Sequence, residues 1–332
     1  SLYNLVVPPA HPLNRLEEVF AKNQCFIPRV LWPIIIEKFM LARTNPFEQR
    51  KCIEFLNFTL ELTTCRPKPI LTVDRGAVME GVHGLFSKID GFFTEYEAPE
   101  QENLWMLKQN ILNFIKLLLG EQTETPKYIH LHGVGGIGKT HFVNRLGRWI
   151  DRLISGSVRF ENLVISSEDA LEGSGNCTGV MLNVLRNQLM KKKRGSIVFI
   201  DEAKWLNSDR MIDAAKRVFN GDQSTISTKY FGDGLGGSGI DLEMPPMLIF
   251  TASNAEIEDP ALRTRFATMS FPSPQKETLV RHAYEIAAED ELVRMRGIDS
   301  QRFDASEWLE RSGIDNFRDV KSRIVPAILA EQ

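Results

Sequence analysis

The sequence predicts an α/β fold in which a doubly wound parallel sheet lies between a helical N-terminal domain and a small helical C-terminal domain. Four short apolar runs between residues 128 and 251 alternate with segments of helical periodicity, and strands separated by helices form parallel sheets. On both sides of this region the apolar residues recur at helical spacing. The expected strands are Tyr128–His132, Asn162–Ser166, Ser196–Ile200 and Met247–Thr251.

The chain divides into three predicted domains. Its 332 residues and hydrophobic content of 43% allow two or three units with buried cores. We expect a helical N-terminal domain over residues 1–98, an α/β core over 99–271 and a helical lid over 272–332. Residues 1–16 are proline-rich and indicate an arm at the start of the first domain.

Two amphipathic helices are expected before the first strand. The apolar residues from Val78 to Phe93 fall on one helix face, and residues 101–119 show the same pattern. A core or interdomain helix explains the first of these. A helix that docks on a membrane surface or a partner is the alternative, but the flanks of Val78–Phe93 lack the Lys and Arg excess typical of membrane surfaces.

Composition argues against several classes of protein. A net charge of −3 does not suit a generally basic nucleic-acid coat, although a local basic groove is compatible with it. No run of about 18 apolar residues occurs, so we expect no membrane-spanning helix. The four cysteines form no C-x-x-C pair, which fits a reducing compartment and gives no zinc-site spacing. We therefore expect an intracellular, cytoplasmic protein.

A phosphate-binding loop is the strongest motif. Residues 133–140 read Gly-Val-Gly-Gly-Ile-Gly-Lys-Thr and match G-x-x-x-x-G-K-[ST] at every fixed position, between the first strand and a helix. Glycines let successive N–H groups converge on phosphate oxygens, and the helix N-terminus adds its dipole. The predicted nucleotide-binding residues are Gly133, Val134, Gly135, Gly136, Ile137, Gly138, Lys139, Thr140 and His141.

This P-loop predicts that ATP binds with Mg²⁺. Lys139 should reach the β- and γ-phosphates, and the Thr140 hydroxyl should ligate Mg²⁺. The apolar run 197–200 leads into two acids that would face the loop at the carboxyl edge of the sheet. Asp201 would hold Mg²⁺ through water, and Glu202 would accept a proton from the attacking water. The sequence therefore predicts Mg²⁺-dependent hydrolysis of ATP to ADP and phosphate.

Together with later motifs, these residues resemble the AAA+ ATPases over about residues 100–325. The last expected strand runs into Ala-Ser-Asn, similar to the sensor-1 element of the family, in which Asn254 would position the attacking water. The segment 259–266 resembles the one that carries an arginine finger, which would reach the γ-phosphate bound by a neighbouring subunit. Arg265 is the first candidate for this finger, and Arg263 is the second.

The resemblance continues into the expected lid. Residues 316–320 read Asn-Phe-Arg-Asp-Val and are similar to the sensor-2 motif, from which Arg318 would reach back to the γ-phosphate. Within the family the Lon and Clp group is closest, because the helix before the P-loop and the segment 220–241 match its order. No peptidase segment follows the lid, so we expect no protease domain.

A site shared between subunits implies a ring-shaped homo-oligomer, most often a hexamer in this family. Hydrolysis would rotate the lid against the core and so remodel or move a macromolecular partner, with a protein partner or substrate expected.

Two other functions stay open. The Gly135-Gly136 pair resembles the loops of NLR-type signalling NTPases, and residues 171–181 lack the pore aromatic of protein-threading AAA+ members. These features keep open a nucleotide-gated switch or scaffold with slow turnover as the first alternative. A nucleic-acid motor, similar to the superfamily 3 viral helicases or a loader, is the second alternative, because those helicases share the P-loop, the asparagine and the arginine pair.

Two clusters have a simpler interpretation. His130 and His132 share a face of the first strand, and without a third ligand nearby we expect packing contacts there and no metal site. The basic run Lys191–Arg194 fits either a nucleic-acid contact or a solvated helix end, and we expect the latter.

Overall fold

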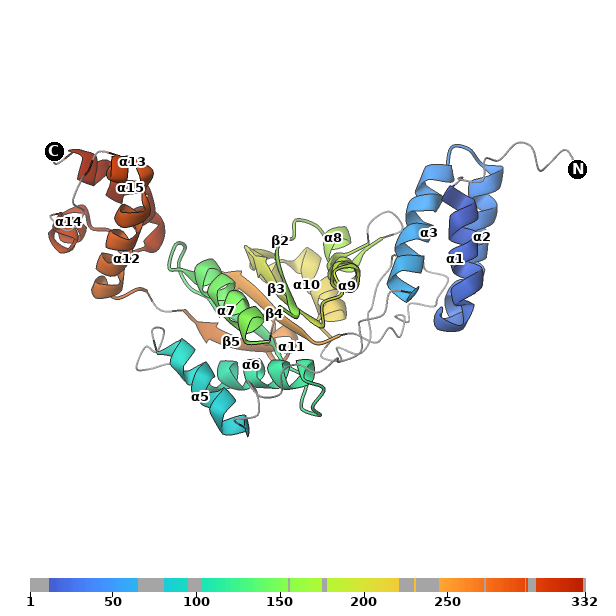
Figure 1. Cartoon of the computed structure of the whole chain (residues 1–332), viewed down its shortest axis with the longest axis horizontal. Coiled ribbons are helices and arrows are strands. Elements are labelled where there is room, and N and C mark those ends of the chain that lie inside the picture. Colours follow the sequence, from blue (N-terminus) through green and yellow to red (C-terminus); the bar gives the residue numbers. More distant parts are fainter. Residues whose placement is uncertain are drawn as a thin grey trace, which may run out of the picture.

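The computed structural model is an α/β structure built around one five-stranded, all-parallel sheet (Figure 1). The residues that the structure describes are 12–64, 81–94, 103–154, 156–174, 178–220, 230, 245–271, 273–295, 297 and 303–330. The strands are β1 (Tyr128–His132), β2 (Val158–Val164), β3 (Gly195–Asp201), β4 (Met247–Ser253) and β5 (Phe266–Ser270). They lie in the spatial order β2-β3-β4-β1-β5. The predicted α/β class with a parallel sheet is therefore confirmed.

The strands at the two edges of the sheet differ most from the prediction. Strand β2 begins and ends earlier than expected. Its first half contains Arg159 and Glu161, which form an ion pair, so this part of the strand lacks the apolar run by which the other strands were predicted. Strand β5 was not predicted, since its short sequence contains Thr268 and directly follows the arginine pair. It forms by pairing with β1, with Phe266 beside Tyr128. Both differences arise where tertiary pairing, and not the local pattern, determines the strand.

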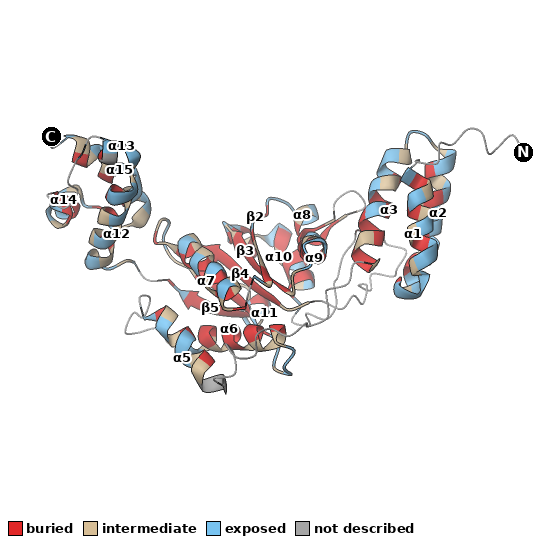
Figure 2. Cartoon of the chain, in the orientation of Figure 1, coloured by how far each residue is buried: buried red, intermediate tan, exposed pale blue. Residues whose placement is uncertain are grey.

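Helices cover both faces of the sheet (Figure 1). One face packs against α5 (Gly81–Phe93), α6 (Leu104–Leu118) and α7 (Lys139–Leu153). The other packs against α8 (Glu168–Glu172), α9 (Val180–Met190) and α10 (Asp209–Val218). Successive strand side chains point to opposite faces, so Phe199 joins the first core while Val198 and Ile200 join the second. Burial concentrates on the strands and on the helix faces that cover them (Figure 2).

Helix α5 belongs to the packing of the α/β core. Its residues Leu85, Ile89 and Phe93 are buried in the same cluster as α6 and the sheet, which supports the core-helix interpretation. The predicted start at Val78 lies outside the described residues. The predicted domain boundary at residue 98 assigned α5 to the N-terminal helices, whereas its described contacts are with the core.

Three helices form the N-terminal unit: α1 (Pro12–Asn23), α2 (Trp32–Thr44) and α3 (Gln49–Thr64), with the 3₁₀ turns η2 (Gln24–Phe26) and η3 (Arg29–Leu31) between the first two. The predicted arm over residues 1–16 is wrong from Pro12 onward, because Leu13 and Leu16 bury one face of α1. Helix α3 packs against α9, where Arg186 donates to Glu61 at 2.8 Å and lies over the Phe58 ring.

The C-terminal residues form a helical unit with its own small core. Its helices are α12 (Lys276–Glu289), α13 (Glu291–Met295), α14 (Ala305–Ser312) and α15 (Phe317–Ala330). Asn316 caps α15, since its Oδ1 accepts from the backbone N–H of Asp319 at 2.9 Å. The helical character expected after Pro274 is present in the described residues, and the domain boundaries themselves stay predictions.

Among the helices of the described segments, none combines the length and the apolar character needed to cross a membrane.

Candidate functional site

Strand order brings the predicted site residues to one edge of the sheet. Strand β4 lies between β1 and β3, and all three are parallel, so their carboxyl ends meet. The P-loop follows β1, Asp201 ends β3, and Asn254 follows β4. The backbone N–H of Gly133 donates to Ser253 O at 3.2 Å, which ties the start of the loop to the end of β4. Three motifs that are far apart in the sequence therefore meet at one edge of the sheet, where ligands bind in many parallel α/β folds.

Lys139 lies folded over the P-loop. Its Nζ donates to Gly133 O at 2.7 Å and to Val134 O at 2.9 Å, and its side chain is buried. Burial lowers the pKa of Lys139, while Asp201 raises it and Arg318 lowers it further. A phosphate at the loop would meet this ammonium directly, together with the backbone N–H groups at the start of α7.

Two loop glycines are required for reasons of geometry. Gly136 and Gly138 have φ angles of 82° and 96°, in the left-handed region that other residues rarely adopt. A Cβ atom on Gly138 would also lie 3.1 Å from the Phe317 ring, and one on Gly136 would lie 2.8 Å from Asn316 Oδ1. The backbone N–H of Phe317 donates to Gly136 O at 3.0 Å. The start of α15 therefore rests directly on the loop.

Thr140 and Asp201 form the candidate magnesium site. The Thr140 hydroxyl donates to Asp201 Oδ2 at 3.0 Å, so the two oxygens predicted to share the ion lie side by side. These residues fit Mg²⁺, because that ion takes oxygen ligands and is held by one or two protein groups plus phosphates and waters. Within the described segments no group of three or more His, Cys, Asp or Glu side chains could hold a metal alone.

Glu202 has a strained backbone at the candidate catalytic position. Its φ and ψ are 52° and 38°, which is left-handed, and it precedes the 3₁₀ turn η4 (Ala203–Asn207). Such a conformation costs an L residue roughly 1–2 kcal/mol. Its backbone N–H donates to Asp201 Oδ1 at 2.8 Å, and its side chain is exposed at the sheet edge. The carboxylate could accept a proton from a water next to the P-loop.

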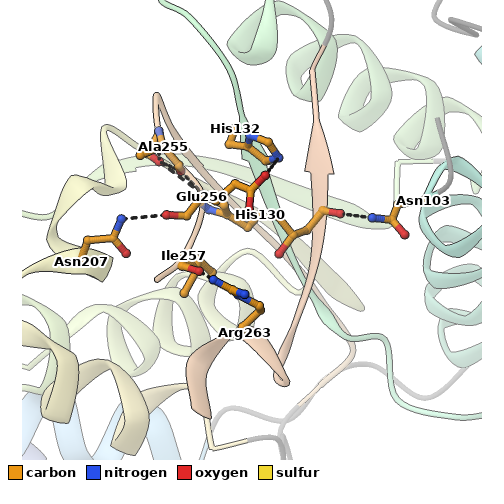
Figure 3. A network of polar contacts seen from close by, with 10 residues as sticks. Asn103, His130, His132, Asn207, Ala255, Glu256, Ile257 and Arg263 are labelled. Atoms are coloured by element: carbon orange, nitrogen blue, oxygen red, sulfur yellow. Dashed lines mark hydrogen bonds and ion pairs between the residues drawn. The ribbon is translucent and has the colours of Figure 1, made fainter. Parts of the chain in front are cut away.

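Buried polar contacts hold the loop after β4 (Figure 3). His130 contacts Ala255 O through Nε2 at 3.0 Å and Thr251 Oγ1 through Nδ1 at 2.8 Å. Because a carbonyl only accepts, Nε2 must carry the proton and Nδ1 must accept from the threonine hydroxyl. Burial lowers the pKa of His130 to about 4, so the ring is neutral near pH 7. Next to it, His132 Nε2 lies 3.6 Å from Glu256 Oε1.

The two arginine-finger candidates differ in their contacts. Arg265 donates to the carbonyls of Lys216 and Phe219, the latter at 3.1 Å, so its guanidinium caps the C-terminus of α10. Arg263 ends α11 (Pro260–Arg263) and is exposed; its Nε donates to Ile257 O at 3.0 Å. The structure therefore gives Arg265 a structural contact in its own chain and leaves Arg263 at the surface.

The lid brings further residues to the P-loop. Arg318 is exposed at the start of α15, close enough to affect the pKa of Lys139. His141 lies at the start of α7 with its ring 6.4 Å from that of His282, and burial, followed by electrostatic interaction with His282 and Arg145, lowers its pKa. The predicted residues 133–141 and Arg318 thus lie together, as do Asp201 and Glu202.

Sequence reasoning missed some candidate residues. Asn207 and Phe317 contact the site, yet neither was singled out. Phe317 stands inside the sensor-2-like motif, which could have signalled its role, whereas Asn207 follows no motif. His130 and His132 were expected to pack, and His130 does so as a polar member of the site. The glycine-rich run 232–239 and part of the 171–181 stretch lie outside the described residues.

No protein-family model matches the chain, and a search among curated proteins finds no match either.

Replacing Glu202 with Gly should raise the free energy of unfolding by about 1 kcal/mol, because glycine adopts a left-handed backbone without the cost that a Cβ atom brings. Lys192, with a φ of 53° at the end of α9, is the matched control, and Lys192→Gly should give a similar gain. Chemical denaturation measures both. A stability loss confined to Glu202→Gly would show that the carboxylate stabilises the fold.

The buried neutral His130 should make the protein sensitive to acid. Its folded pKa of about 4 lies below the unfolded value of 6.5, so only the unfolded chain gains a proton between these values. The stability contribution is therefore complete above pH 6.5 and is lost as pH falls toward 4, by roughly 3 kcal/mol. The free energy of unfolding, measured by denaturation across this range, should depend less steeply on pH for His130→Gln than for the wild-type protein. Equal slopes would contradict this account.

Proposed function

We propose that the protein is an AAA+-type ATPase that hydrolyses ATP with Mg²⁺ at a site completed by a neighbouring subunit, and that it remodels or moves a macromolecular partner. The observation that carries the proposal is the meeting of Lys139, the Thr140–Asp201 pair and the Asn254 loop at one sheet edge. Each of these supplies one requirement of phosphoryl transfer: charge for the phosphates, ligands for the metal, and a polar group for the water.

Binding would use the loop and the first turn of α7. The backbone N–H groups of residues 134–140 would surround the β- and γ-phosphates, and Lys139 would exchange its contacts with Gly133 O and Val134 O for phosphate oxygens. Thr140 and Asp201 would hold Mg²⁺, which neutralises charge on the phosphates when bound. Their hydrogen bond keeps both oxygens in place before the ion arrives.

Hydrolysis would use Glu202 and Asn254 together. Glu202 would accept a proton from a water whose oxygen attacks the γ-phosphorus, and ADP would leave with the bridging oxygen. Asn254 would hold that water from the end of β4. The left-handed backbone of Glu202 supports this role, since strain of this kind is retained where it aims a side chain at a reaction.

Arg263 is the arginine that we propose for the neighbouring site. An arginine finger must be free to reach a phosphate outside its own chain, and Arg265 is bound to the C-terminus of α10. Arg263 is exposed, with one contact to Ile257 O. A site completed in this way supports a ring-shaped homo-oligomer, with a hexamer as the expected size.

The lid would report on the nucleotide through α15. Phe317 already bonds to Gly136 O, and Arg318 stands beside Lys139. A γ-phosphate at the loop would attract Arg318, and its release would remove that attraction. This supports a rotation of the lid during each cycle.

The N-terminal helices support a protein as the partner. They expose large apolar side chains, with Met40 at 63% and Phe47 at 94% exposure, beside Val30 and Ile36. Contiguous exposed apolar surface is typical of protein interaction sites, and these exposed side chains are the reason that the proposal names a protein as the partner. The net charge of −3 provides no general basic surface for nucleic acid.

Three substitutions test the shared ATP site. Lys139→Ala should abolish ATP binding, and Glu202→Gln should keep binding while turnover falls roughly 10²–10⁴-fold. Arg263→Ala should reduce turnover roughly 10³-fold with ATP binding unchanged, because the finger acts only on transition-state charge. Phosphate release and binding of labelled ATP measure these effects.

Arg265→Ala is the control for the finger. It should lower the thermal midpoint, because α10 loses its cap, and should retain more turnover than Arg263→Ala. Undiminished turnover in Glu202→Gln would overturn the base assignment. If Arg265→Ala lost more turnover than Arg263→Ala, Arg265 would be the better candidate for the arginine finger.

The partner class is tested by stimulation of turnover. We expect an unfolded protein to raise the ATPase rate several-fold, while single-stranded RNA and DNA leave it unchanged. Stimulation by a nucleic acid alone would replace the proposal with a nucleic-acid motor. A slow rate indifferent to all three would favour a nucleotide-gated switch.

A further inference from the structure

Asn207 binds the loop after β4 with both ends of its side-chain amide (Figure 3). Its Nδ2 donates to Glu256 O at 2.7 Å, and its Oδ1 accepts from the backbone N–H of Glu258 at 3.0 Å. One side chain thus satisfies a donor and an acceptor two residues apart, as a neighbouring strand would. This holds the orientation of the peptides between Glu256 and Glu258.

The opposite side of the same loop is fixed to the P-loop strand. His130 donates to Ala255 O from β1, and Ser253 Oγ donates to the same carbonyl at 2.6 Å. The side chain of Ile257 is buried in the core between these contacts. The segment 254–258 is therefore held from two sides and can shift only as a unit.

Asn207 is itself tied to the candidate catalytic acid. It ends η4, which begins directly after Glu202 and buries Trp205 and Leu206. The backbone N–H of Glu202 is in turn bound to Asp201 Oδ1. A displacement of Asp201 and Glu202 would therefore also displace Asn207, because the short turn η4 connects them and is anchored by its buried side chains.

The far end of the loop holds the exposed arginine. Ile257 O accepts from Arg263 Nε, so the Ile257–Glu258 peptide, whose N–H donates to Asn207, sets the direction of the Arg263 side chain. The loop thus has Asn254 at its start and the support for Arg263 at its end. Asn207 holds the peptides from Glu256 to Glu258, which lie between these two ends.

We propose that Asn207 is a positioning residue that links a subunit's own ATP site to the arginine it offers to its neighbour. The proposal rests on the function proposed above. Asn207 touches no reacting atom; it keeps the 254–258 loop aligned with Asp201 and Glu202. A subunit with ATP at its own site would thereby present Arg263 to the next subunit in the correct direction.

The test uses donor subunits that cannot hydrolyse ATP themselves. Subunits with Glu202→Gln bind ATP and can contribute only their Arg263 to a wild-type neighbour. Wild-type subunits are mixed with an excess of such donors, co-assembly is checked by size, and turnover per wild-type subunit is measured. Donors that also carry Asn207→Ala should reduce this turnover about tenfold, because a displaced arginine stabilises the transition state poorly.

Two further donors supply the comparison. Asn103→Ala is the matched control, since the Asn103 amide also bonds to a backbone carbonyl, Thr268 O at 2.6 Å, but on β5 and not in the 254–258 loop, and it should leave this turnover unchanged. Asn207→Asp keeps the acceptor for Glu258 N–H and loses the donor, so it should have an intermediate effect. Turnover of the wild-type neighbour should thus fall in the order Asn207→Asp, then Asn207→Ala. General destabilisation of the donor is not expected to produce this order.

The outcomes separate the two proposals. If donors with Asn207→Ala and Asn207→Asp match the Glu202→Gln donor while Arg263→Ala donors reduce turnover, the positioning role is overturned and the shared site stands. If Arg263→Ala donors also have no effect, the shared site itself fails.

Discussion

The pairing of β4 with both β1 and β3 is the constraint on which the candidate site depends. Without β4 in that place, the P-loop and Asp201 would follow adjacent strands and Asn254 would lie elsewhere. The ladder runs from Ile129–Phe250 to His132–Ser253 on one side and from Ser196–Met247 to Ile200–Thr251 on the other. Every side chain of β4 is buried, so its register is fixed by packing on both faces.

A buried histidine inside such a sheet needs a complete set of partners. His130 is fully buried in the sheet, where an unpaired ring nitrogen would be costly. Thr251 and Ala255 supply one partner for each nitrogen, and both belong to β4 or the loop that follows it. The need to satisfy one ring therefore determines the path of the chain after β4. This explains how a buried packing residue can position a candidate catalytic loop through one hydrogen bond to its backbone.

The sequence predicted the parts of the molecule that local chemistry determines. The P-loop, β1 and the acids after β3 were expected in place, because glycine spacing and buried strand runs have few alternative structures. Strand β5, the start of α1 and the contacts of Asn207 were not expected, since they depend on partners far away in the chain. Arg265 shows the same limit: its position in the motif indicated a finger, but only the fold shows that the end of α10 lies beside it.

The two outer strands of the sheet each carry a feature that blocks further pairing. Strand β2 holds the Arg159–Glu161 ion pair along its length, and the outer carbonyl of Thr268 in β5 is occupied by Asn103. Charged side chains and occupied backbone groups at a sheet edge prevent another chain from adding a strand there. Copies of this protein that come together are therefore expected to meet through side chains more readily than by extending the sheet, which makes strand addition at these edges less favourable.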